Sequence, residues 1–270
     1  MTKTTVTAKQ KTNAANPNLY NWNLWLALAH AFQGALILLL SSTRLFPVET
    51  QYLTKDPIAS ELAGSTVISS ATKHLFDINL AYVVAAFFFM AAIAHGLMAT
   101  VYRSQYEADL KKRTNRIRWF EYSLSASTML IAVAVLSGVT DFSTLVLIFV
   151  LTAVMHLVGS SIESSNQSKA KPNWYLAAVS LLAALAPWLV FALYAWSSNV
   201  YGDGGVPTFV YWVYISMFAI FGGFATNMYM QFKKVGNWKD YLYGERMYMV
   251  LSLAAKTILA WQIFAGSLRS

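Results

Sequence analysis

Long apolar runs alternate with short polar stretches along most of this chain. Seven of the runs reach about 20 residues, which is the length of helix that crosses a hydrocarbon core about 30 Å thick. They cover approximately 22–42, 78–102, 117–138, 141–162, 174–197, 208–232 and 246–268. Only intrahelical hydrogen bonds can satisfy the backbone in lipid. The pattern therefore predicts an all-α membrane protein, a bundle of seven transmembrane helices.

The remaining segments are too short for a second domain. Residues 1–21 form a polar N-terminal tail, and residues 22–268 form the bundle. One connection, at about 43–77, is long; Pro47, Pro57 and Gly64 indicate turns within it, but the pattern assigns it no secondary structure.

Composition supports a membrane protein and excludes other classes. The chain is 57% hydrophobic and 12% charged, which is too apolar for an ordinary soluble domain. It contains no cysteine, so disulfides and thiolate metal sites are excluded, and we expect no metal site. The net charge of +8 does not indicate nucleic-acid binding, because the basic residues flank the apolar runs, where membrane topology explains them.

The placement of lysine and arginine predicts the orientation. Cytoplasmic connections carry the excess of these residues. The side of the N-terminal tail has 15 of the 20: Lys3, Lys9, Lys11, Arg103, Lys111, Lys112, Arg113, Arg116, Arg118, Lys169, Lys171, Lys233, Lys234, Lys239 and Arg246. The opposite side has Arg44, Lys55, Lys73 and Arg269. We therefore expect a multi-pass protein of the cell membrane with a cytoplasmic N-terminus and an extracellular C-terminus, the long 43–77 loop lying outside.

One lysine lies inside a predicted span. Lys256 is about ten residues from the start of the seventh run, which places it about 15 Å deep at 1.5 Å per residue. A charge at mid-bilayer costs about 2.5–3.5 kcal/mol on insertion scales, so it needs a partner or a function. A structural lysine paired with a carboxylate and a transport site are both open readings.

The third run contains a carboxylate that could be the partner. Glu121 is the only acidic residue deep in the predicted spans, and Tyr122 and Ser125 lie beside it. Arg118 is three residues earlier, on the same helix face, so a pair between Glu121 and Arg118 is the alternative. Because an uncompensated buried charge is costly, the buried Lys256 favours a pair with Glu121.

Other polar residues in the spans are histidines and a serine. His30 and His95 fit a polar pocket in the half of the bundle that holds Glu121. We interpret His156 as a structural histidine with its hydrogen bonds satisfied, because nothing at helical spacing around it is ionisable. Ser252 is one helical turn before Lys256, so its hydroxyl lies on the face of the lysine.

Two segments resemble a known family. The run from Tyr243 to Gly266, centred on Lys256, resembles the seventh helix of heliorhodopsins, and the run from Arg118 to Ser127 resembles their third helix. Heliorhodopsins have a cytoplasmic N-terminus, which agrees with the orientation that the charges predict. The resemblance extends through all seven spans.

The resemblance implies a cofactor and a site. It makes Lys256 the attachment point of all-trans retinal, held as a protonated Schiff base, and Glu121 the counterion. It implies further chromophore contacts from Ser252, Ser125, Tyr122, Trp188 and Phe221, and a polar network on the cytoplasmic side made of His30, His95, Arg118 and Glu163. It also implies a light-sensing photoreceptor rather than an enzyme, a homodimer in membrane lipid, and a cytoplasmic signalling partner that the sequence does not identify.

Two other functions stay open at this stage. Light-driven proton transport needs further carboxylates across the bundle, but Asp77, Asp141 and Asp203 lie at helix ends or in outer loops, and Ala132 stands three turns beyond Glu121. Because these proton-carrying carboxylates are missing from the predicted spans, sensing is favoured over pumping. A light-gated conductance stays possible, since it can run through waters and hydroxyls. A retinal-free transporter or scaffold with Lys256 and Glu121 as its site is the second rival.

Overall fold

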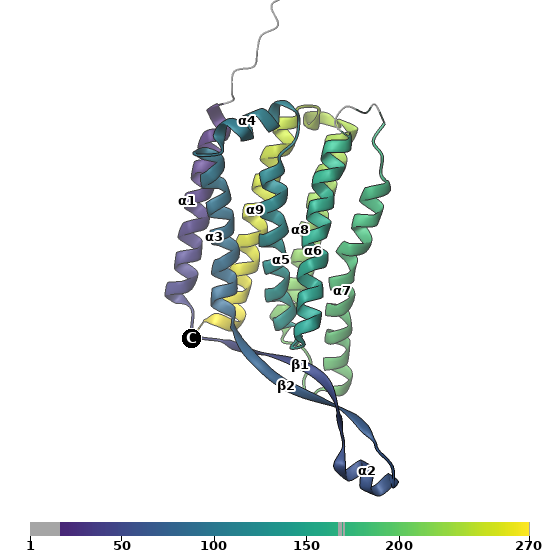
Figure 1. The fold of residues 1–270 in the computed structure, drawn as a ribbon. Coiled ribbons are helices and arrows are strands. Elements are labelled where there is room, and N and C mark those ends of the chain that lie inside the picture. Colours follow the sequence, from purple (N-terminus) through teal and green to yellow (C-terminus); the bar gives the residue numbers. More distant parts are fainter. Residues whose placement is uncertain (1–16, 167–168, 170, 270) are drawn as a thin grey trace, which may run out of the picture.

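The computed structural model describes residues 17–166, 169 and 171–269. Seven long helices form a bundle (Figure 1). They are α1 (Pro17–Leu40), α3 (Leu80–Ala99), α5 (Arg116–Leu136), α6 (Phe142–Asn166), α7 (Tyr175–Tyr201), α8 (Thr208–Lys233) and α9 (Tyr241–Ile263), the last continued by the π-helical turn η2 (Phe264–Leu268). Each is long and apolar enough to cross a membrane, which confirms the seven predicted spans and a multi-pass membrane protein.

Two helices begin about five residues earlier than the apolar pattern predicted. Helix α1 begins at Pro17 instead of 22, and the rest of the predicted tail, with Lys3, Lys9 and Lys11, lies outside the described residues. Helix α9 begins at Tyr241 instead of 246, because the Asp240 carboxylate accepts a hydrogen bond from the Leu242 N–H and caps the helix there. The polar first turns of α9 therefore belong to the bundle.

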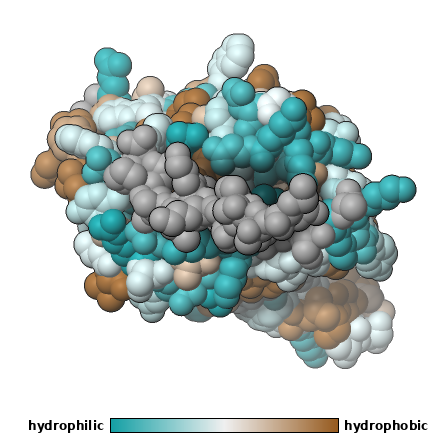
Figure 2. Space-filling view, turned by 90° about the horizontal axis from the view of Figure 1, so that it is seen from above, coloured by the Kyte–Doolittle hydropathy of each residue, from teal (hydrophilic) through white to brown (hydrophobic). Residues whose placement is uncertain are grey.

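The two ends of the bundle differ in structure and charge. One end, which we call the α4 end, carries the short helix α4 (Arg103–Lys111) and the 3-10 turn η1 (Gly236–Lys239). The other, the hairpin end, carries strands β1 (Leu45–Lys55) and β2 (Ile68–Asn79) with helix α2 (Pro57–Ala63) at the tip (Figure 1). Helix α1 begins at the α4 end and η2 ends at the hairpin end. Hydrophilic residues gather on the α4 end (Figure 2).

The connection to which the sequence assigned no structure is an antiparallel hairpin. Its register runs from Leu45 opposite Asn79 to Lys55 opposite Ile68, with a bulge between Val48 and Glu49. The Glu49 N–H donates to the Thr140 carbonyl at 2.9 Å, which fastens the hairpin to the turn between α5 and α6. The all-α prediction therefore holds for the membrane bundle but misses this two-stranded sheet.

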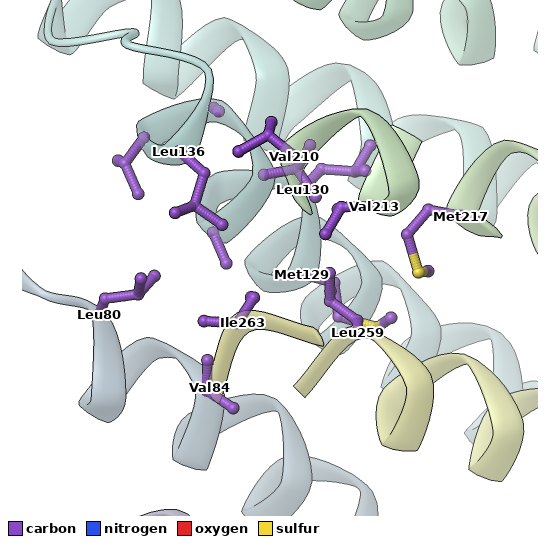
Figure 3. Close-up of a cluster of buried hydrophobic side chains, with 14 of the residues drawn as sticks. Leu80, Val84, Met129, Leu130, Leu136, Val210, Val213, Met217, Leu259 and Ile263 are labelled. Atoms are coloured by element: carbon purple, nitrogen blue, oxygen red, sulfur yellow. The ribbon is translucent and has the colours of Figure 1, made fainter. Parts of the chain in front are cut away.

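An apolar core fills the hairpin half of the bundle. All seven long helices contribute to it, and members from α3, α5, α8 and α9 interdigitate around the second half of α5 (Figure 3). They include Leu80, Val84, Met129, Leu130, Leu136, Val210, Val213, Met217, Leu259 and Ile263. Ala132, on α5, is also fully buried there. The polar side chains of α5 and α9 therefore lie mostly in the other half.

Candidate functional site: a buried lysine at the end of an apolar cavity

Lys256 of α9 and Glu121 of α5 meet inside the bundle. The Lys256 Nζ lies 3.1 Å from Glu121 Oε1, and the two residues are 2% and 5% exposed. The same nitrogen donates a hydrogen bond to Ser252 Oγ at 2.8 Å, as the spacing along the helix predicted. Each charge offsets the cost of burying the other. The alternative pair of Glu121 with Arg118 is not the arrangement found, because Arg118 binds two other carboxylates.

A cavity begins at the lysine. It has a volume of about 540 Å³, within the range of about 300–1,000 Å³ that is typical of small-molecule sites, and its walls are mainly apolar. Residues of α5, α6, α7, α8 and α9 line it. The expected chromophore contacts are all among them: Tyr122, Ser125, Trp188, Phe221, Ser252 and Lys256.

Several lining residues were not in the sequence prediction. They include Trp119, His156, Phe224 and Tyr248. The His156 Nδ1 lies 2.8 Å from the Thr152 carbonyl of its own helix, which agrees with a structural histidine, and the ring also lines the cavity. Aromatic residues in apolar helices carry no signal that separates a cavity wall from ordinary packing, so the sequence could not single these out.

The close approach of α5 to α6 beside the cavity depends on a glycine. A Cβ atom placed on Gly159 would collide with the indole ring of Trp119. The Trp119 Nε1 donates to Glu163 Oε2 at 2.8 Å, and the ring stands edge-on to Tyr122 and Tyr248. Gly159 therefore allows the indole to lie between the cavity and the buried carboxylate of Glu163.

The structure divides the expected polar network into two groups. The first joins α1 and α3: the rings of His30 and His95 stack with their centroids 5.7 Å apart, and His95 Nδ1 lies 2.7 Å from the Asn23 side-chain oxygen. Tyr106 of α4 is buried above this group. Burial raises the pKa of its phenol, and the negative charge of Glu245 raises it further, so the hydroxyl stays protonated.

The second group is a buried ion cluster between α5, α6 and α9. Arg118 lies 2.6 Å from Glu163 Oε1 through one terminal nitrogen and 2.6 Å from Glu245 Oε1 through the other. Asn115 binds both carboxylates, its backbone N–H donating to Glu163 and its side-chain amide to Glu245. The Tyr241 hydroxyl contacts the same two carboxylates at 3.1 and 3.0 Å.

The residues expected in one polar network, His30, His95, Arg118 and Glu163, therefore lie in two groups of direct contacts. No direct hydrogen bond or ion pair joins the two groups among residues 17–166, 169 and 171–269. Glu245 was missed because it lies before the apolar run, where a charged residue is typical of a loop. Its position on α9, one turn after the helix begins, makes it a buried partner instead.

Tyr248 connects this ion cluster to the cavity. Its ring lies under the Arg118 guanidinium, with 3.8 Å from the guanidinium carbon to the ring centre, and it also lines the cavity. Its backbone carbonyl accepts a hydrogen bond from the Tyr122 hydroxyl at 3.0 Å. Tyr248 therefore contacts both the cavity and the charges at the α4 end.

Comparisons with known proteins agree with this geometry. The family model for heliorhodopsin matches residues 19–268. The crystal structure of the transmembrane domain of the rhodopsin phosphodiesterase of Salpingoeca rosetta is similar, with a TM-score of 0.64 and 16% sequence identity over 93% of this chain and 84% of that chain. At this identity the likeness shows the fold alone, a rhodopsin-like bundle. No curated protein matches the chain.

Proposed function

The chain belongs to the heliorhodopsin family, which makes it a retinal-binding rhodopsin and not an enzyme, and we propose that it is a light sensor. In this proposal Lys256 carries all-trans retinal as a protonated Schiff base and Glu121 is its counterion. The observation that carries the proposal is a buried primary amine, paired with one carboxylate, at the end of a long apolar cavity.

The residues present fit this cofactor. A primary amine is the side-chain group that condenses with an aldehyde to an imine, and an apolar site limits the access of water to that bond. Retinal, when bound, supplies a polyene that absorbs visible light and isomerises. The aromatic walls at Trp188 and Phe221 suit an apolar chain, and the fully buried Ser125 Oγ has no hydrogen-bond partner among the described residues.

The side chains around the amine have distinct tasks. The Glu121 carboxylate stabilises a positive charge on the nitrogen and holds its proton there. The Ser252 hydroxyl accepts a hydrogen bond from that nitrogen and so fixes its direction. Together they position one proton in a cavity that has no other charged residue among its described lining residues.

A route for a conformational signal leads toward the α4 end. Tyr122 lies beside the amine, with its ring centre 5.6 Å from Lys256 Nζ, and binds the backbone of Tyr248. Tyr248 lies under Arg118, which holds α5, α6 and α9 together through Glu163 and Glu245. A displacement at the nitrogen therefore biases the packing of three helices, which is how a local change becomes a signal.

The hairpin half of the bundle supports sensing over pumping. A pump needs proton-carrying groups on both sides of the nitrogen. Among the described residues, no carboxylate is buried between Lys256 and the hairpin end, where the core is mainly apolar (Figure 3). Ala132, three turns beyond Glu121, is fully buried. Light-driven or light-gated ion transport and a retinal-free scaffold are the rival outcomes of the experiments below.

Reconstitution with retinal tests the proposal. Adding all-trans retinal to membranes that contain the protein should produce a visible absorption band, which Lys256→Ala abolishes and Glu121→Gln displaces. Lys239→Ala, which changes an exposed lysine at the α4 end, should keep the band. No band in the parent would favour the scaffold. Illuminated cells in unbuffered medium should show no uncoupler-sensitive pH change, and a robust change would overturn the sensor.

Orientation and partners are further parts of the proposal. The charge asymmetry supports a cytoplasmic α4 end, where a signalling protein would dock, and an extracellular hairpin and C-terminus. Exposed apolar side chains on the hairpin, among them Leu53, Ile58 and Leu62, support a homodimer in lipid.

Three experiments test these parts of the proposal. Labelling of single cysteines introduced at each end, in intact cells, tests the orientation. Cross-linking tests the dimer, and pull-down in dark and light tests the signalling partner.

A further inference from the structure

Helices α7 and α8 leave an opening in the side of the bundle. Helix α7 packs mainly against α6, and α8 packs mainly against α9, while α7 and α8 have little direct backbone packing. Aromatic contacts join them at two levels. Trp188 stands edge-on to Phe218 with centroids 5.2 Å apart, and Trp174, just before α7, lies against Tyr229 at 5.5 Å.

Small residues line the stretch between these two contacts. Ala177, Ser180 and Ala184 of α7 and Gly222 and Ala225 of α8 all border the cavity. A Cβ atom on Gly222 would meet nothing within 4 Å, so the space beside it is open. We call this opening, from Trp174 and Tyr229 to Trp188 and Phe218, the side window.

The side window is long, apolar and turned toward lipid. Trp174 and Trp188 are fourteen positions apart, which is about 21 Å along a helix at 1.5 Å per residue. Leu181 and Phe218 on its rim are each 56% exposed on membrane-spanning helices. Its wall toward the α4 end includes Ile162 of α6. An acyl chain matches this length and polarity.

The mouth of the side window at the α4 end is basic and aromatic. The Lys233 Nζ lies 5.9 Å from the centre of the Tyr229 ring, and Lys171 is exposed just before Trp174. Neither lysine forms an ion pair with any described residue of the chain. Aromatic rings at this level are typical of the membrane–water interface. Free lysines beside them offer a site for a negatively charged headgroup.

We propose that the side window binds one anionic phospholipid, with an acyl chain between α7 and α8 and the phosphate at Lys233 and Lys171. The bound lipid closes the side of the cavity against the bilayer. The site needs neither retinal nor a signalling partner, so its failure would leave the proposed photoreceptor untouched.

Native mass spectrometry of the delipidated full-length protein tests the headgroup. Phosphatidylglycerol should be retained at higher occupancy than phosphatidylcholine with the same acyl chains, with one preferred lipid per chain. Lys233→Gln should reduce the affinity for phosphatidylglycerol about fivefold, whereas Lys239→Gln, at the same end but away from the window, should not. Equal retention of the two lipids, or equal effects of the two substitutions, would overturn the proposal.

Two neighbouring alanines test the acyl chain. Ala177→Trp fills the side window, while Ala178→Trp places the same ring on an exposed position that does not line it. The first should abolish the preferred phosphatidylglycerol and the second should keep it. Circular dichroism and the elution volume in size-exclusion chromatography show whether each variant is folded. If Ala177→Trp misfolds, Ala177→Leu replaces it as the smaller change. Retention of the lipid in both tryptophan variants would place it elsewhere on the surface.

Discussion

The guanidinium carbon of Arg118 lies 3.8 Å from the ring centre of Tyr248, while its two terminal nitrogens reach Glu163 and Glu245 at 2.6 Å each. One arginine thus holds two buried carboxylates and an aromatic wall of the cavity. Its loss would leave two negative charges facing each other in a site with little water. This arrangement makes Arg118 a structural centre for the α4 half of the bundle.

Arg118→Gln should destabilise the protein strongly. Breaking a buried ion pair by removing one partner costs about 3–5 kcal/mol, because the other charge stays buried without compensation. Thermal unfolding in detergent, followed by circular dichroism, measures the effect. Arg103→Gln is the control: its side chain is 47% exposed and pairs with Glu107, whose side chain is 31% exposed, and such a solvated pair contributes at most about 1 kcal/mol. Similar losses in both variants would contradict the buried cluster.

Glu121→Gln should make the visible band more sensitive to alkali. The carboxylate keeps the proton on the nitrogen by opposite charge, and a neutral amide does so less well, so the band should be lost about 1–3 pH units lower. A spectrophotometric titration of the retinal-loaded protein measures this midpoint. Glu107→Gln changes a carboxylate on α4 that pairs with Arg103, and it should leave the midpoint in place. An unchanged midpoint in the Glu121→Gln variant would show that Glu121 is not the counterion.

Tyr122→Phe should loosen the contact between α5 and α9. The change removes the hydrogen bond to the Tyr248 carbonyl and leaves that buried oxygen with one partner fewer, at a cost of about 1 kcal/mol. Tyr82→Phe removes a hydroxyl from an exposed residue of α3 and should be nearly neutral. The difference in unfolding temperature between the two variants measures the bond. If the two temperatures agree, the link from the amine to Tyr248 is not a stabilising contact.

Much of this fold could be predicted from the sequence because lipid imposes simple requirements. A run of about 20 apolar residues has few alternatives to a spanning helix. The same physics pairs Lys256 with Glu121, since neither charge is tolerated alone in the bundle. The hairpin had no such constraint: its strands lie outside the bundle, alternate weakly, and begin near Pro47, which is more typical of a turn.

The ion cluster and the side window could not be predicted in the same way. Glu245 and Asn115 lie at the ends of apolar runs, where a polar residue is ordinarily solvated. Their burial depends on how α4, α6 and α9 close over them. The window depends on which faces α7 and α8 turn toward each other, and two uniformly apolar helices give no periodic signal of that choice.

Gly159→Ala tests the packing that separates the cavity from the ion cluster. The added methyl group would overlap the Trp119 ring, which the hydrogen bond to Glu163 holds in place, so the substitution should cost about 1–3 kcal/mol. Gly96→Ala on α3 is the matched control. Its new Cβ meets nothing within 4 Å, and an alanine inside a helix is more stable than a glycine by about 0.5–1 kcal/mol. Thermal unfolding of both variants should therefore shift in opposite directions. A stabilised Gly159→Ala variant would show that the indole does not occupy the space beside α6.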